Sequence, residues 1–126
     1  MKNSNLIGVF STFSPKEMKE FRYFVTSPFF NKNESVILLF DVLRKYYPDF
    51  PEAKIEKEYV YTRIFKGTKY NDGFMRKIMH TLFQLAESYI SIKGFTENLP
   101  AVNDELMKQY YTRNSSSLFL KTRKNV

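Results

Sequence analysis

Residues 71–93 read NDGFMRKIMHTLFQLAESYISIK, and this stretch contains the pattern that decides the fold class. Its apolar side chains recur three and four positions apart from Phe74 to Ile90, while its polar side chains collect on the opposite side. Asn71 is placed to cap the first turn and Gly94 to end the last one. An apolar face of this length needs other helices to cover it. The stretch therefore indicates an all-α protein.

A second helix is expected upstream, at the sequence SPKE, which has the form of a capping box. Ser14 would be the N-cap, Pro15 the first helical residue and Glu17 the side chain that reaches back to the cap. Pro28 disfavours a helical backbone at the residue before it. We therefore expect this helix to end at or before Ser27.

Two more helices are expected between these. One begins at Asn31 or Asn33, which are both suitable caps, and runs to Tyr47, where a proline stops it. Apolar residues occupy so much of its circumference that other elements must surround most of it. A shorter helix is expected at about residues 56–66, with Gly67 as the residue that ends it.

The sequence after Gly94 carries weaker signals. Its pattern permits a helix from Asn103, followed by a short helix or a frayed segment. We therefore expect a single compact domain, orthogonal or bundle-like, of about five to six helices. Residues 1–94 would form its helical core, and residues 95–126 a C-terminal helical extension with a basic tail.

The positive charge is concentrated near the C-terminus. The chain has a net charge of +7, and residues 108–126 contain five basic residues and no acidic one. Residues 1–107 hold the other 15 bases against 13 acids. A nucleic-acid-binding domain usually gathers its basic residues on the folded part of the chain. This distribution weakens that interpretation for the helical core.

The composition also limits the chemistry and the location of the protein. The chain contains no cysteine, which excludes disulfides, thiolate zinc sites and thiol catalysis. The apolar run near the N-terminus, Leu6–Phe10, is too short for a signal peptide or a membrane span. We expect a cytoplasmic protein without membrane association.

Two adjacent phenylalanines lie where a connector is expected, in TSPFFNKNES at residues 26–35. In one interpretation, Phe29 and Phe30 fold back between the helices that they join, since each ring can bury roughly 150–250 Å². In the other, at least one ring stays exposed as an anchor for another protein, because aromatic residues are enriched at interface hot spots. The first is favoured, since an exposed aromatic pair is costly for a monomer.

A resemblance to a protein family is carried by three stretches: FSPKEMKEFRYFVTSPFFNKN, LRKYYPDF and IFKGTKYNDGFMRKIMHTLFQLAESYI. They resemble the N-terminal region of an uncharacterised all-helical family of Bacteroidota-type bacteria. The resemblance covers about residues 13–92. It implies a helical domain that opens a longer, all-helical protein. It implies no activity, cofactor or functional residue.

Enzymatic chemistry finds little support in the sequence. His80 is the only histidine, so a catalytic triad, a histidine metal site or a histidine acid–base group would have to use it. The pattern places His80 on the polar face of its helix. The nucleophile-elbow, zinc-protease and phosphate-loop motifs are missing. We expect a non-enzymatic protein, and we predict no catalytic, cofactor-binding or metal-binding residue.

Nucleic-acid binding is the alternative function. The helix at about 56–66, a short turn and the helix at about 72–93 have the outline of a helix-turn-helix or winged-helix-like domain. Side chains that could reach phosphates and base edges are Arg76, Lys77, His80 and Gln84 on the polar face, with Lys121, Arg123 and Lys124 in the tail. The discriminating feature is whether the fold gathers Lys57, Arg63, Arg76 and Lys77 with the tail bases on one surface.

A helical protein–protein interaction module is the preferred function, with an unidentified protein as its partner. Ile37 and Leu38 lie beside a narrow polar strip of their helix, where a shallow apolar groove could accept a partner helix or a further part of the same protein. An N-terminal helix in the sequence NLIGVFSTF could equally cover both residues. The candidate partner-binding residues are Phe29, Phe30, Ile37 and Leu38, and the segments 110–111 and 118–120 are further candidates.

Overall fold

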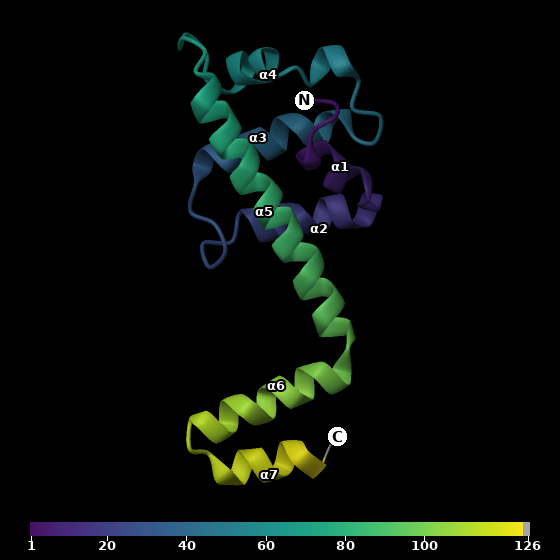
Figure 1. Ribbon diagram of the computed structural model, residues 1–126, viewed down its shortest axis with the longest axis vertical. Helices are drawn as coiled ribbons and strands as arrows, with labels where there is room; N and C mark the ends of the chain where they lie inside the picture. The colour runs from purple at the N-terminus through teal and green to yellow at the C-terminus, as the bar shows by residue number, and fades with distance from the viewer. Residues whose placement is uncertain (125–126) are drawn as a thin grey trace. The chain divides into compact units, whose positions relative to one another are not determined.

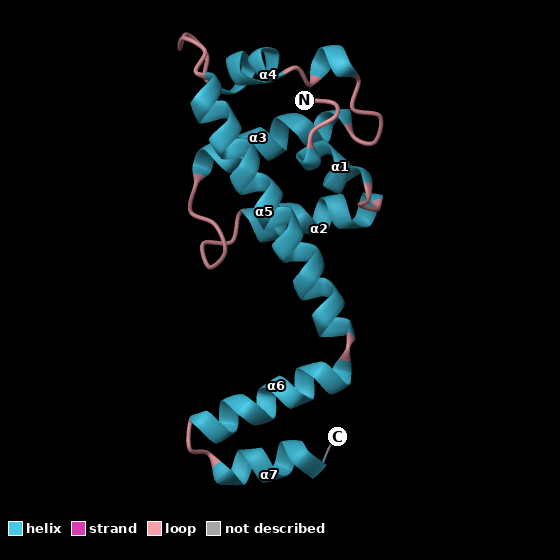
Figure 2. Ribbon diagram, in the orientation of Figure 1, coloured by secondary structure: helices cyan, strands magenta, loops and turns pink. Residues whose placement is uncertain are grey.

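The computed structural model describes residues 1–124, and Figures 1 and 2 show helices joined by loops over this range. Residues 1–124 contain seven α-helices and no strand. The helices are α1 (Asn5–Ser11), α2 (Pro15–Val25), α3 (Glu34–Leu43), α4 (Lys57–Ile64), α5 (Asp72–Glu97), α6 (Leu99–Thr112) and α7 (Ser116–Lys124). Two single-turn 3₁₀ helices, η1 (Arg44–Tyr46) and η2 (Glu52–Lys54), lie between α3 and α4. The all-α class is confirmed, but the predicted number of helices is too low.

The helix starts follow the capping chemistry of the sequence. The Ser14 hydroxyl accepts the Glu17 N–H at 3.1 Å, and the Glu17 carboxylate accepts the Ser14 N–H at 2.9 Å. The predicted capping box is therefore confirmed. Of the two candidate caps for α3, Asn33 takes the role, since its side chain accepts the Ser35 N–H at 3.0 Å. Asn31 instead forms side-chain hydrogen bonds in the preceding loop.

Two predicted helix ends are wrong. α3 ends at Leu43 instead of Tyr47, because its continuation tightens into the 3₁₀ turn η1. α5 passes through Gly94 and continues to Glu97. Glycine weakens a helix interior by only about 1 kcal/mol and ends a helix mainly when it adopts positive φ. Gly67 does so, with φ of 76° in the loop after α4.

The chain divides into two compact units, residues 1–89 and residues 90–126. In the first unit, α1 to α4 gather around the N-terminal part of α5 (Figure 1). The rings of Phe10, Phe21 and Phe40 meet at its centre, with centroids 5.0–5.6 Å apart. The residues that α5 buries recur at the predicted helical spacing: Met75, Ile78, Leu82, Ala86 and Tyr89.

The second unit contains the hairpin of α6 and α7 (Figure 1). α6 begins before the predicted start at Asn103, because Asn98 caps it by accepting the Ala101 N–H at 3.3 Å. α6 buries none of its side chains. Thr122 is the one buried side chain among those described at residues 90–123. Every buried apolar side chain of the described residues belongs to the first unit.

Candidate functional site

The two phenylalanines of the α2–α3 loop have different environments. Phe30 stacks on Phe24 of α2, with ring centroids 4.3 Å apart and an angle of 23° between the rings. Phe24 in turn stacks on Phe21 in the core. Phe29 meets Phe30 edge-on at 5.0 Å and is 87% exposed, whereas Phe30 is 41% exposed. The favoured interpretation, in which both rings fold back, is therefore wrong for Phe29, whereas Phe30 packs onto the core through Phe24.

Hydrogen bonds hold the loop that presents Phe29. The buried side chain of Asn31 donates to the Val25 carbonyl at 2.9 Å and accepts the Asn33 N–H at 3.0 Å. The N–H groups of Phe30 and Asn31 both donate to the Ser27 carbonyl, at 3.0 and 2.9 Å. These hydrogen bonds give the loop a defined conformation. The backbone that carries the exposed Phe29 ring is therefore fixed.

Ile37 and Leu38, the other predicted partner-binding residues, also differ from each other. Ile37 is partly buried and packs against the core of the first unit. Leu38 is 46% exposed. Of the two side chains, Leu38 is the exposed one, in the middle of α3.

Most of the large exposed apolar side chains of the second unit lie on α6 and α7. Tyr111 belongs to the segment 110–111, a candidate named from the sequence, and it is 73% exposed. The other large exposed apolar residues of α6 and α7 are Leu99, Leu106, Leu118 and Leu120. A helix pair normally buries its apolar stripe against a further element. In this hairpin, the large apolar side chains named above stay exposed.

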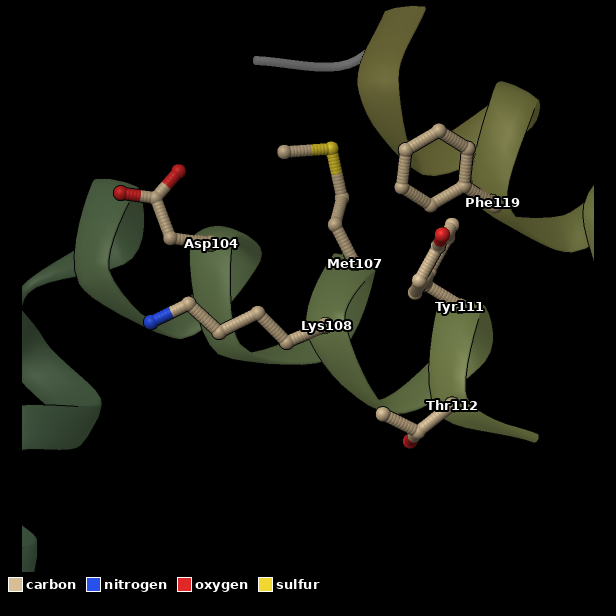
Figure 3. A pocket seen from close by; sticks show the side chains of 6 residues that line it. All are labelled: Asp104, Met107, Lys108, Tyr111, Thr112 and Phe119. Atoms are coloured by element: carbon tan, nitrogen blue, oxygen red, sulfur yellow. The ribbon is translucent and has the colours of Figure 1, made fainter.

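A hollow of about 460 Å³ lies along the hairpin (Figure 3). Figure 3 shows the rings of Tyr111 and Phe119 next to each other, with Met107 beside them. The ring centroids of Tyr111 and Phe119 are 6.1 Å apart. The charged ends of Asp104 and Lys108 lie beyond Met107, on the side away from Phe119. The hollow thus has an apolar centre and carries both signs of charge at one end.

The residues predicted to bind nucleic acid lie exposed on α5: Arg76, Lys77, His80 and Gln84. The carboxylate of Asp72 partly neutralises this surface, since it pairs with Arg76 at 2.9 Å and with Lys57 at 3.1 Å. Tyr70 donates its hydroxyl to the same carboxylate. Hydrogen bonds from Tyr70 and then Lys57 lower the pKa of Asp72, so it stays ionised well below neutral pH.

The connection between α4 and α5 differs from the predicted short turn. α4 ends at Ile64 and α5 begins at Asp72, whereas a helix-turn-helix joins its helices through about 3–4 residues. A winged helix needs strands, and residues 1–124 contain none.

His80 borders a hollow of about 230 Å³ together with Leu6 and Phe83.

The basic tail is helical where the structure describes it. Lys121 and Arg123 are exposed on α7. The side chain of Lys124 lies outside the described residues. The tail bases and the α5 bases belong to different units of the chain.

Sequence reasoning missed a second basic surface, formed by α2 and η1. Lys19, Arg22, Arg44 and Lys45 line two hollows there. The sequence shows these bases in separate segments, and only tertiary packing brings them together. A pair of bases on the outer face of α2, followed by RK at residues 44–45, was the available signal.

Among residues 1–124, no group of three or more His, Asp or Glu side chains could hold a metal ion. No helix in the same range has both the length and the apolar character needed to cross a membrane. Comparisons of the chain with protein-family models, with curated proteins and with solved structures give no match. A functional proposal therefore rests on the geometry alone.

Proposed function

We propose that this protein is a non-enzymatic helical interaction module whose α6–α7 hairpin binds another protein. The observation that carries the proposal is that α6 buries no side chain while Leu99, Leu106 and Tyr111 stay exposed on it. Covering apolar surface stabilises a complex by roughly 25 cal/mol per Å² removed from water. A partner that covers these side chains would supply the packing that the hairpin lacks.

Tyr111 and Phe119 are the expected anchors. Aromatic residues in pockets supply much of the binding energy at protein interfaces, while their neighbours mainly exclude water. The two rings face one hollow, and Met107 adds a flexible apolar side chain that adapts to a partner's shape. Phe29, held on its fixed loop, is a second anchor on the first unit.

Site-specific photocrosslinking tests this function. A benzophenone side chain is placed at Tyr111 or at Leu120, and at exposed Lys66 as the control. In cells that produce the natural protein, we expect a defined protein adduct from the two hairpin positions and none from Lys66. Equal adducts from all three positions, or no adduct from the hairpin, would contradict the proposal.

Nucleic-acid binding stays the second candidate, because Arg76, Lys77 and His80 are all exposed along one helix. The ion pair between Asp72 and Arg76 weighs against this candidate, because it neutralises part of the basic surface. The substitution Asp72→Asn separates the two candidates. If the second is right, releasing Arg76 and Lys57 strengthens binding to labelled duplex DNA, and the gain disappears at high salt. If the interaction module is right, neither form binds DNA tightly.

Two further expectations stay part of this proposal. One is membership of the uncharacterised all-helical family that residues 13–92 resemble. The other is a cytoplasmic location. Both are compatible with a module that binds a protein partner inside the cell.

A further inference from the structure

Two adjoining hollows lie over α2 and η1 in the first unit. The larger, of about 460 Å³, is lined by Pro15, Met18, Lys19, Arg44, Lys45 and Tyr47. The smaller, of about 240 Å³, shares Lys19 and Arg44 and adds Arg22 and Tyr23. We call these residues together the α2–η1 surface. Its lining contains four basic side chains and no acidic one.

The charges of this surface are only partly balanced. Asp41 of α3 binds the Arg22 guanidinium through two contacts, at 2.9 and 3.1 Å, and lies 3.7 Å from Arg44. Among the described residues, no carboxylate lies within 4.0 Å of the Lys19 or Lys45 amine. Asp41 therefore balances part of the charge of the two arginines, and neither lysine amine has a carboxylate within this distance among the described residues.

The α2 helix also carries two acidic residues, and both have other contacts. Glu17 accepts the Ser14 N–H in the capping box, and Glu20 accepts the hydroxyl of Tyr89. Neither residue lines the two hollows. The local field at the α2–η1 surface is therefore positive.

Three apolar residues line the larger hollow, Pro15, Met18 and Tyr47, and we call them its floor. The four basic side chains of the two hollows are its rim. The floor is held in place by contacts with the rest of the first unit. Met18 is buried, and Tyr47 donates its hydroxyl to the Phe13 carbonyl. The Tyr47 ring also packs edge-on against Phe50, with centroids 6.0 Å apart. Pro15 fixes the backbone on the remaining side. A ligand thus meets a preformed apolar floor within a cationic rim, which lowers the cost of ordering on binding.

We propose that the α2–η1 surface binds an acidic peptide segment of a partner protein. One aliphatic or aromatic side chain of the peptide would rest on Pro15, Met18 and Tyr47. Flanking carboxylates would pair with Lys19 and Lys45, and a further one with Arg44. The hollows lie on the first unit, so this binding is independent of the α6–α7 hairpin.

Charge and shape favour this occupant over two others. A second copy of the chain has a net charge of +7, so the cations of the surface would repel it. A nucleic-acid backbone would place phosphates near Asp41 and would leave the apolar floor without a matching group. In an acidic peptide with one large apolar side chain, the carboxylates match the basic rim and the apolar side chain matches the floor.

A displayed library of random short peptides tests the proposal, selected against the whole chain. Parallel selections use the double variant Lys19→Glu/Lys45→Glu and the matched control Lys66→Glu/Lys69→Glu, which makes the same change in charge at two other exposed lysines. We expect the wild type and the control to enrich peptides with Asp or Glu around a Leu, Ile or Phe. The Lys19→Glu/Lys45→Glu variant would lose this family of peptides.

An enriched peptide is then labelled and its affinity measured by fluorescence polarisation. We expect the reversal at Lys19 and Lys45 to weaken binding by at least about tenfold and the control to weaken it by less than about twofold. Replacing the apolar residue of the peptide by Ser should also weaken binding.

Three results would overturn the proposal: no acidic family after selection, an equal loss in both variants, or displacement of the peptide by an oligonucleotide that binds more tightly at the same salt concentration. The last result would assign the surface to nucleic acid. All four lysines are exposed, and matching unfolding midpoints of the two variants would confirm that both fold. The crosslinking experiment on the hairpin can fail or succeed separately.

Discussion

Phe30 stacks on Phe24 at a centroid distance of 4.3 Å, and this contact continues the aromatic packing of the core out to the α2–α3 loop. Phe29 touches only the outer edge of that stack and stays 87% exposed. Two neighbours of identical chemistry therefore have separate roles. Phe30 holds the loop, and Phe29 is presented by it.

Alanine substitutions should separate these two roles. Phe30→Ala removes the stacking on Phe24 and should lower the free energy of unfolding by about 1 kcal/mol. Phe29→Ala removes a mostly solvated ring and should change that free energy by less than about 0.5 kcal/mol. Urea denaturation followed by circular dichroism measures both. Equal losses from the two variants would show that Phe29 also supports the fold.

Asn31 should be the most sensitive polar residue of the loop. Asn31→Ala leaves the Val25 carbonyl and the Asn33 N–H without their side-chain partner. Because the hydrogen bond to the Val25 carbonyl is buried, we expect a loss of about 1–3 kcal/mol in the free energy of unfolding. Lys32→Ala, at an exposed neighbour, is the matched control. The same urea measurement applies, and an unaffected Asn31→Ala variant would mean that the loop is not held as described.

Tyr70 should titrate abnormally. Burial, followed by its hydrogen bond to Asp72, raises the pKa of Tyr70 from 10.0 to about 12. Carbon-13 NMR of the ring carbon that bears the hydroxyl should show this value. Asp72→Asn should lower the pKa of Tyr70, because it removes the carboxylate acceptor and its charge, while the effect of burial remains.

The raised pKa has a consequence for stability with a definite sign. The folded state holds the Tyr70 proton more tightly than the unfolded state does. Its contribution to stability is thus complete below pH 10.0 and is lost as the pH rises towards about 12. Comparing wild type with Tyr70→Phe across that window isolates the effect. A difference in stability that stays constant through the window would be inconsistent with the raised pKa.

The sequence predicts those features that depend on local chemistry. The capping box at Ser14 and the apolar spacing of α5 both follow from near neighbours, and the structure has both. Gly94 failed as a helix end because its identity alone does not determine its backbone angles. Residues after Gly94 gave weak signals because α6 has no buried face to impose a clear periodicity.

Features that depend on tertiary packing could not be predicted from the sequence. The different exposure of Phe29 and Phe30 follows from where Phe24 lies, and the ion pair between Asp72 and Lys57 follows from how α4 meets α5. The α2–η1 surface combines bases far apart in the chain. Spacing rules within one helix could not bring them together.

Native-state hydrogen exchange of the purified, monomeric chain tests the central claim most directly. If α6 lacks a buried face, its amides should exchange at least roughly a hundredfold faster than those of the core segment 75–82 in α5. Light scattering at the same concentration would verify that the sample is monomeric. Protection of α6 equal to that of segment 75–82 would show that the chain covers the hairpin itself, and would contradict the claim that the hairpin awaits a partner.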